Sequence, residues 1–491
     1  MSQAIARRHL LQAAIASAAV VAFNPVSRVW ATEAEIDSEP EDSVLQVPPL
    51  DGQLLLDAGT QATAADDFGH IIHQSPWAVL VPGSIRDIRK MVKFARTHSL
   101  SITGTRGVGQ SHSSYGQAQV DGGIIVDMSG MNEIGQVGCN SVWVQAGARW
   151  SAILQATLPY GKSPPTLTDY IELSVGGTIS AGGIGGMASK NGLVVDNVIE
   201  LEVVTGKGKF LRCSPWHRPQ LFHALRSGLG QFGIIVRARL RLVDVPSMAR
   251  AYTAVYGDIN TFTSDQMMLV DDGRFDYVEG FASFSAGGGF IYILEAVKYF
   301  DPGAPPDDAA LLAGLSFIPG TEGIADQTYF DFANRLAPTI AFLESIGAWG
   351  LPHPWLDVFV PGPDAASFIG NVLAQTTEAS MGQGPIIIYP VRRDKVHTPF
   401  LRLPESEHFF LLSLLRTAFP PTPENIADLL AQNRAIYDAL VDIGGKRYPI
   451  DAVEVTQADW QEHFGDAWDD FVAAKDEFDP DNVLSPGQKI F

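Results

Sequence analysis

The sequence predicts an α+β protein of two domains, and three observations support this prediction. The chain has 491 residues, 46% of them hydrophobic, which is more than one ordinary core requires. A strand pattern, a helix pattern and a second strand pattern follow one another from Ala78 to Thr105. Residues 246–440 again mix strand patterns such as FIYILEAVKYF with helix patterns such as ENIADLLAQNRAIYDALVDI.

The first 31 residues have the pattern of a twin-arginine export signal. Arg7 and Arg8 precede the apolar run AAIASAAVVAF, and Val29-Trp30-Ala31 offers a cleavage site. The alternative is a chance arginine pair before an anchor helix, but the run is short for a span of about 20 residues. We therefore expect an exported protein, periplasmic or extracellular, with no stable membrane insertion after signal removal. Residues 32–65 are then a leader that lies outside the folded domains.

Charge and cysteine content restrict the partners. The formal net charge is -21, which argues against binding nucleic acid and favours small-molecule partners. The two cysteines, Cys139 and Cys213, have no metal-ligand spacing around them. We expect both to be buried apolar residues, and we expect no metal site.

The first elements lead to a candidate ligand-binding loop. AVLVP and LSITGT predict strands on either side of a helix over residues 85–98. Arg106, Gly107, Val108 and Gly109 follow the second strand, where glycine lets backbone N–H groups approach an anion such as a pyrophosphate. The third glycine of the Rossmann fingerprint and a long following helix are missing, so a nicotinamide-type unit is a poor interpretation. A glycine-rich surface turn is the alternative.

Two further glycine-rich segments indicate a long, flat ligand. They span residues 175–186 and 228–235, and they bracket the strand patterns NVIELEVVTG and GIIVRARLRLV. Three walls of small residues fit a flavin dinucleotide, so FAD is the cofactor that the pattern favours.

Nine segments in one order resemble the cytokinin dehydrogenases, which are FAD-linked oxidoreductases of the vanillyl-alcohol oxidase and p-cresol methylhydroxylase superfamily. The segments are HSSYGQA, LTDY, VGGTIS, ELEVVTGKG, GLGQFGIIVRAR, HPWLDVFVP, GPIIIYP, HFGDAWDDF and DPDNVLSPGQKIF. They run from about residue 66 to the last residue. The resemblance implies a discontinuous FAD-binding domain, residues 66–245 and 441–491, with an α/β substrate (cap) domain inserted over residues 246–440.

The resemblance also implies a covalent flavin. The family motif RGxGHSxxGQA joins glycines that hold the pyrophosphate to a histidine bonded to the flavin 8-methyl carbon. This chain carries two additional residues, Gln110 and Ser111, before the histidine. Alignment on HSSYGQA assigns His112 as the flavin anchor, whereas alignment on the arginine places Gln110 there. A noncovalent flavin, with His112 as a polar wall residue, is the alternative.

Asp169 matches the family aspartate that accepts a hydrogen bond from the substrate amine while hydride leaves for the flavin. The expected reaction is oxidative cleavage of an N-substituted adenine to an aldehyde and adenine. The alternative role for Asp169 is that of a cap or turn residue. The family's tryptophan in the substrate pocket is replaced by Val396, and Trp355 is interpreted as a core residue. The resemblance assigns further cofactor contacts to Ser113, Gln117, Asp169, Ser174, Thr178, Ser180, Ile184, Ile235, Tyr448, Ser485 and Gln488, whose alternative role is packing around glycines.

Two rival functions stay open at this point. One is an FAD-linked oxidase of the same superfamily that acts on an alcohol, sugar or lactone. The other is a flavin-binding or purine-binding protein without turnover. The motifs do not decide whether oxygen or a quinone accepts the electrons.

Overall fold

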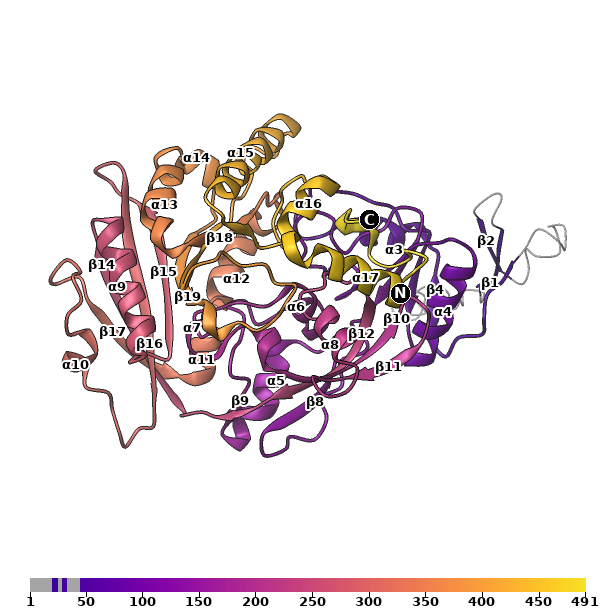
Figure 1. Ribbon diagram of the computed structural model, residues 1–491, viewed down its shortest axis with the longest axis horizontal. Coiled ribbons are helices and arrows are strands. Elements are labelled where there is room, and N and C mark those ends of the chain that lie inside the picture. Colours follow the sequence, from indigo (N-terminus) through magenta and orange to yellow (C-terminus); the bar gives the residue numbers. More distant parts are fainter. Residues whose placement is uncertain (1–19, 25–28, 33–44) are drawn as a thin grey trace, which may run out of the picture.

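Three main β-sheets, with helices packed against them, make up the molecule (Figure 1). The computed structural model describes residues 20–24, 29–32 and 45–491. Two sheets of four strands come from the first half of the chain, and one sheet of eight strands comes mainly from the second half. Mixed and antiparallel sheets with separate helices fit the predicted α+β class.

The first sheet confirms the predicted strand, helix and strand. Its order is β4 (Gln53–Leu55), β5 (Ala78–Val81), β7 (Ile124–Asp127) and β6 (Ile102–Thr105), and β7 is parallel to both β5 and β6. Helix α4 (Ile85–Thr97) connects β5 to β6 and begins at Ser84, whose side chain accepts the Arg86 N–H. The helix forms here because Ile88, Met91 and Val92 recur on one face and are fully buried.

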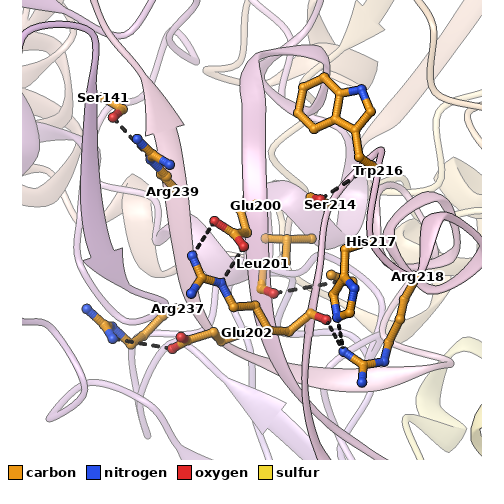
Figure 2. A network of polar contacts seen from close by, with 12 residues as sticks. Ser141, Glu200, Leu201, Glu202, Ser214, Trp216, His217, Arg218, Arg237 and Arg239 are labelled. Atoms are coloured by element: carbon orange, nitrogen blue, oxygen red, sulfur yellow. Dashed lines mark hydrogen bonds and ion pairs between the residues drawn. The ribbon is translucent and has the colours of Figure 1, made fainter.

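The second sheet shows why one face of a strand is polar. It contains, in order, β11 (Phe210–Cys213), β10 (Val198–Thr205), β12 (Gly233–Arg241) and β8 (Ser141–Gln145), all antiparallel. On β10, Leu201 and Val203 are fully buried. Glu200 and Glu202 alternate with them, and they pair with Arg212 and Arg237 on the neighbouring strands (Figure 2). The predicted strands are confirmed, and their alternation decides which face packs inward.

The third sheet has a helix-covered face and a face turned toward the first half of the chain. Its antiparallel order is β17 (Gly323–Thr328), β14 (Met248–Tyr256), β16 (Phe290–Phe300), β15 (Tyr277–Phe284), β19 (Ile386–Arg392), β20 (His408–Leu414), β18 (Leu356–Pro361) and β21 (Lys446–Arg447). Helices α9 (Ile259–Asp272), α13 (Ala365–Ala374) and α15 (Pro423–Asp442) bury residues in the core on one face. Tyr277, Tyr389 and Leu411 belong instead to the core of the first two sheets.

The C-terminal segment returns to the first two sheets. Helices α16 (Gln457–Phe464) and α17 (Trp468–Phe478) lie beside the N-terminal elements (Figure 1). Leu484 then forms a parallel bridge with Ile102 of β6. The buried Lys475 ammonium donates to the backbone carbonyls of Gln231, at 3.2 Å, and Leu484, at 3.5 Å. These bonds hold the last residues next to the third glycine-rich segment.

Short elements complete the chain. The helices are α3 (Ala58–Ala64), α5 (Trp150–Thr157), α6 (Val175–Ala181), α7 (Ala188–Asn191), α8 (Pro219–Leu225), α10 (Asp308–Leu312), α11 (Tyr329–Ala333), α12 (Ala337–Ser345) and α14 (Glu378–Met381). Strands β9 (Lys162–Ser163) and β13 (Val243–Asp244) form a separate pair. In residues 20–24, 29–32 and 45–491, no helix is both long and apolar enough to cross a membrane.

The N-terminal region differs from the prediction where it is described. Strands β1 (Val20–Asn24), β2 (Val29–Thr32) and β3 (Leu45–Gln46) form a small antiparallel sheet. Phe23 and Trp30 are buried, and the Trp30 ring lies 5.8 Å from that of Phe94 on α4. Their aromatic rings cover apolar surface of α4, a contact that the sequence pattern did not predict. The predicted arginine pair, Arg7-Arg8, lies outside the described residues, as does the acidic run of the leader.

The cysteine prediction is half correct. Cys213 is buried in β11, whereas Cys139 is exposed, and neither forms a disulfide. Cys139 differs because it lies in the turn before β8, where backbone polar groups stay near the surface.

Candidate active site

A cavity of about 430 Å³ lies between the eight-stranded sheet and the two four-stranded sheets. Its first wall comes from the end of β6, the 111–118 loop and α6, and its second wall comes from β18, β19 and β20. The residues before and within α12 close one side with the side chains of Leu336, Thr339, Ile340 and Leu343. The end of β6 and the glycine-rich segments 175–186 and 228–235, far apart in sequence, therefore meet at one site.

Most of the predicted site residues line this cavity. They are Arg106, His112, Ser113, Gln117, Asp169, Ser174, Thr178, Ser180, Ile184, Ile235, Tyr448, Ser485 and Gln488. Several of their polar groups already bind the protein: the Ser180 hydroxyl donates to the Gly176 carbonyl at 2.9 Å, and the Gln117 amide donates to the Asp451 carbonyl at 2.9 Å. Such residues shape the wall as well as offering contacts to a ligand.

The loop glycines differ from the prediction. Gly107, Val108 and Gly109 do not line the cavity. The Val108 N–H, expected to face an anion, donates instead to the Asp127 carboxylate at 3.1 Å. The Val108 side chain packs against the small buried cluster under β5 and β7. Asp127 thus turns the loop away from the cavity, and no local pattern around residue 108 predicts this bond.

His112 lies in an aromatic environment on the cavity wall. Its ring stacks on Phe68 at 4.2 Å between centroids and lies 4.9 Å from Tyr170 and 5.6 Å from Trp355. Burial, with the charge of Arg106, lowers the pKa of His112 to about 3, so the imidazole is neutral. Gln110, the other candidate for the same role, does not line the cavity, and its side chain accepts a hydrogen bond from Arg149 at 2.7 Å.

A buried carboxylate that sequence reasoning missed holds the loop of His112. Asp67 accepts hydrogen bonds from the Ser113 hydroxyl at 2.8 Å, the Gly116 N–H at 2.8 Å and the Gly69 N–H at 3.1 Å. Burial raises its pKa to about 6 despite these donors. These bonds fix the residues that follow the histidine, Ser113 to Gly116, against the segment of Asp67 and Gly69, and so restrict the position of the ring.

Asp169 is the cavity-lining member of an acidic cluster. Its Oδ1 accepts from the Tyr277 hydroxyl at 2.8 Å and from Arg335 Nη2 at 3.1 Å. Arg335 also contacts Glu279 at 2.9 Å and Glu295 at 3.2 Å. The Arg335 guanidinium therefore contacts the carboxyl groups of Asp169, Glu279 and Glu295. Of these three, Asp169 alone lines the cavity.

Burial favours the protonated forms of the other acidic members of the cluster. Burial and the charge of Asp169 raise the pKa of Glu279 well above its usual range, and burial also raises the pKa of Glu295. Burial raises the pKa of Tyr277 well above 10, so its phenol remains a hydrogen-bond donor. Asp169 is the carboxyl group of this cluster that a ligand in the cavity can contact. The sequence could have indicated part of this cluster, because Glu279 interrupts the apolar strand pattern YVEGFASF. The residues around Arg335 contain no comparable pattern.

The aromatic wall also differs from the prediction. Trp355, interpreted as a core residue, lines the cavity, and so does Trp349, which no sequence motif singled out. Val396, the expected replacement for a pocket tryptophan, does not line the cavity and packs against the main core.

Comparison with known proteins identifies the family. A family model for an FAD binding domain matches residues 76–214, and a model described as cytokinin dehydrogenase 1, FAD and cytokinin binding, matches residues 282–491. The chain is 37% identical to cytokinin dehydrogenase 2 of Arabidopsis thaliana over 475 residues, which is 89% of this chain and 93% of that protein. This chain belongs to the cytokinin dehydrogenase family. It is an FAD-dependent oxidoreductase.

Two further proteins extend the comparison. An uncharacterized oxidoreductase in the fasciation locus of Rhodococcoides fascians is 39% identical over 87% of this chain and 96% of its own length. The crystal structure of 6-hydroxy-D-nicotine oxidase from Arthrobacter nicotinovorans superposes with a TM-score of 0.68 at 21% identity, covering 89% of this chain and 98% of that one. The latter match shows that the two proteins share a fold.

The cavity of this family member fits FAD. Its lining includes Gly104 of β6 and glycines from the two later predicted segments, among them Gly177 and Gly230, so backbone can approach a flat ligand closely. Arg106 lines the same cavity with its Nε unpartnered, and none of the carboxylates in the described part of the chain forms an ion pair with it. A half-buried guanidinium without an ion pair suits an anion such as a pyrophosphate.

Tyr448 supports the wall of this cavity through one hydrogen bond. Its hydroxyl accepts the buried Gly183 N–H at 2.8 Å, where Gly183 has a positive φ of 77°. In the Tyr448→Phe variant this N–H loses its acceptor, so we expect the free energy of unfolding to fall by about 1–3 kcal/mol. Denaturant titration of the holoprotein measures the change.

Tyr437→Phe is the matched control for this prediction. Tyr437 is also a buried tyrosine, on α15, and it packs under the Arg434 guanidinium without receiving a backbone hydrogen bond from any described residue. We expect its loss of stability to be below about 1 kcal/mol. Equal losses in the two variants would contradict the role given to the Gly183 bond.

Proposed function

We propose that the protein is an exported, FAD-dependent amine oxidoreductase that oxidatively cleaves the side chain of N-substituted, cytokinin-like adenines. The observation that carries this proposal is a carboxyl group, Asp169, held by Tyr277 and Arg335 on the lining of a cavity whose walls near α12 are apolar. Leu336, Ile340 and Leu343 suit a hydrocarbon side chain, and Trp349 suits a flat ring. Several relatives of the chain are named cytokinin dehydrogenases, which supports the same substrate class.

In the proposed mechanism, Asp169 binds the substrate N–H and takes its proton. Tyr277 and Arg335 donate hydrogen bonds to Asp169 Oδ1, and these bonds hold the carboxylate in place during the proton transfer. FAD, when bound, accepts the hydride from the carbon next to the nitrogen. The loss of a proton and a hydride converts the amine to an imine, which water hydrolyses to an aldehyde and adenine.

We also propose that His112 carries the flavin covalently. A neutral imidazole can attack an electrophilic carbon, whereas a protonated one cannot, and burial keeps this imidazole neutral. Its stacking on Phe68 and the bonds that Asp67 makes to the same loop restrict its orientation.

The domain arrangement that we propose is an inserted cap. Strands β14 to β20, residues 248–414, form one sheet, to which the short β21, residues 446–447, adds an edge strand, and the later Leu484 pairs with Ile102 near the start of the fold. This connectivity supports a discontinuous FAD-binding domain, residues 66–245 and 441–491, around a cap of residues 246–440. Export by a twin-arginine signal is a further proposal, for which the motif at Arg7 and Arg8 is the support.

A panel of substrates tests the proposed function. Under anaerobic conditions, isopentenyladenine should bleach the flavin absorbance, and alditols and lactones should not, because a polyol requires several polar partners that the apolar wall does not offer. Bleaching by the polyols alone would replace the proposal with the alcohol, sugar or lactone alternative. Bleaching by none of them would favour a binding protein without turnover.

The electron acceptor is decided by a separate measurement. Stopped-flow reoxidation of the reduced enzyme with oxygen and with a quinone gives two rates, and the faster one at matched concentration identifies the oxidant class.

A further inference from the structure

Asp357 is a buried carboxyl group in the cavity for which the mechanism has no use. It lies at the start of β18, and its side chain is 3% exposed although it lines the cavity. Its Oδ1 accepts a hydrogen bond from the Ser413 hydroxyl on β20. Its Oδ2 is buried and has no hydrogen-bond partner among the described residues. A buried oxygen without a donor is costly, so a donor from a bound molecule would satisfy it.

The surrounding protein does not neutralise this carboxyl group. Arg447, a buried basic side chain on the neighbouring strand β21, is paired with Asp451. The charge of Asp451 adds to the burial of Asp357, and together they raise the pKa of Asp357 to about 7. Within the described residues, Asp357 forms no ion pair with an arginine, lysine or histidine. The fold thus buries an acid without supplying the second partner that buried acids usually have.

The position of Asp357 on the sheet relates it to Asp169. Asp357 pairs with Ser413, Ser413 pairs with Ile387, and Ile387 pairs with Phe281 of β15. Strand β15 also carries Glu279 and Tyr277, which belong to the cluster around Asp169. Three strand spacings, on the order of 14 Å, therefore separate the backbone of Asp357 from that of Phe281, which lies two residues from Glu279. A purine with a five-carbon side chain is of this order of length, so one molecule can extend from Asp357 toward the cluster around Asp169.

A second unpartnered group lies between the two centres. Tyr389 lines the cavity from β19, and its buried hydroxyl has no hydrogen-bond partner among the described residues. The hydroxyl can donate to a ring nitrogen or accept from an N–H or O–H. Asp357 and Tyr389 thus present free polar atoms on the wall that also carries the apolar Ile387 and Leu411.

We propose that Asp357, with Tyr389 beside it, forms a polar subsite that binds a hydrogen-bond donor on the part of the substrate remote from the reacting amine. This inference rests on the proposed function and names a further determinant of its specificity. The donor is an O–H or N–H group: on an N-substituted adenine, it is either a hydroxyl at the end of the side chain or the ring N9–H. Both offer the proton that the free Asp357 oxygen lacks.

Three substrates distinguish the two sources. They are isopentenyladenine, its analogue with a terminal hydroxyl on the side chain, and its N9-methyl analogue, which lacks the ring donor. Anaerobic stopped-flow spectroscopy gives the rate constant of flavin reduction and the apparent Kd for each with the holoenzyme. In the wild type, we expect one donor to improve the ratio of rate constant to Kd by about 10- to 100-fold over its donor-free counterpart.

Two variants connect that preference to Asp357. In Asp357→Leu, substrates with and without the donor should give about the same ratio of rate constant to Kd, because no acceptor is left. In Asp357→Asn, which keeps an acceptor oxygen and the shape of the side chain, part of the preference should remain. Ile387→Val, on β19, changes the volume of the same wall without changing its polarity, and it should keep the wild-type preference. Flavin loading and the melting temperature report whether each variant is folded.

Each outcome decides the proposal. Loss of the hydroxyl preference identifies the side-chain donor, and loss of the N9–H preference identifies the ring donor. Equal ratios for all three substrates in the wild type, or an equal decrease for all three in Asp357→Leu, would overturn the subsite. A shifted flavin spectrum and potential in Asp357→Leu with unchanged ratios would also overturn it and assign the donor to the flavin instead. If no adenine bleaches the wild-type flavin, the proposed function is wrong, and the proposed substrate subsite is wrong as well.

Discussion

Replacing Asp169 by asparagine is expected to lower the rate of flavin reduction by about 10²- to 10⁴-fold, the range that a general base contributes. The amide would keep the size of the side chain and an oxygen for the Tyr277 and Arg335 donors, which lie 2.8 and 3.1 Å from Asp169 Oδ1. It would lose the basicity that takes the substrate proton. Anaerobic stopped-flow reduction with isopentenyladenine measures the rate, and its concentration dependence gives substrate binding separately.

Asp276→Asn is the matched control for the Asp169 variant. Asp276 is also half-buried and paired with cations, Lys190 and Lys298, but it does not line the cavity. We expect its rate to stay within about threefold of the wild type, since ion pairs near the surface contribute little. An Asp169→Asn enzyme that reduces its flavin at the wild-type rate would remove Asp169 from the mechanism. One that loses its flavin would support a role in holding the turn beneath the cofactor.

Replacing His112 by alanine should convert an acid-stable flavin into one that acid releases completely. The wild-type protein, precipitated with acid and washed, should remain yellow, because a covalent bond survives unfolding. The variant should still fold and bind flavin, since Asp67 holds the loop through Ser113 and Gly116 and not through the His112 ring. Absorbance of the pellet and the supernatant measures the partition.

Gln110→Ala is the control that tests the alignment. Gln110 lies two residues before His112, bonds to Arg149 and stays outside the cavity lining, so its loss should leave the flavin acid-stable. Release of flavin from the wild-type protein by acid would disprove covalent attachment. An acid-stable flavin in His112→Ala combined with release in Gln110→Ala would move the attachment to position 110.

Much of the fold could be predicted because its elements have local patterns. The helix over residues 85–98 was expected from apolar spacing, and α4 spans Ile85–Thr97. The run FIYILEAVKYF became β16 without a change of boundary. The N-terminal strands were not predicted, because Phe23 and Trp30 gain their burial from Trp77 and Phe94, residues of a distant segment. Local propensity carries no information about such a partner.

The site was predicted only as far as individual motifs reach. Asp169 and His112 stand in segments that resemble the family's motifs, and both line the cavity. Their partners do not have such segments: Tyr277 lies 108 residues from Asp169 along the chain, and Arg335 lies 166 residues away. Nothing in ANRLAP distinguishes Arg335 from a surface arginine until the fold encloses it.

The sequence by itself determined the family, the cofactor class and the two side chains expected to act on flavin and substrate, because these depend on short stretches whose chemistry is local. Only the tertiary structure decided that the Val108 N–H is bound by Asp127 and faces away from the cavity, that Arg335 serves three carboxyl groups, and that Asp357 is buried with a free oxygen. Hydrogen-bond satisfaction and burial are properties of groups brought together from distant parts of the chain. No single segment contains them, so they are seen only in the fold, where β18, β19 and the segments of His112 and Asp169 line one cavity.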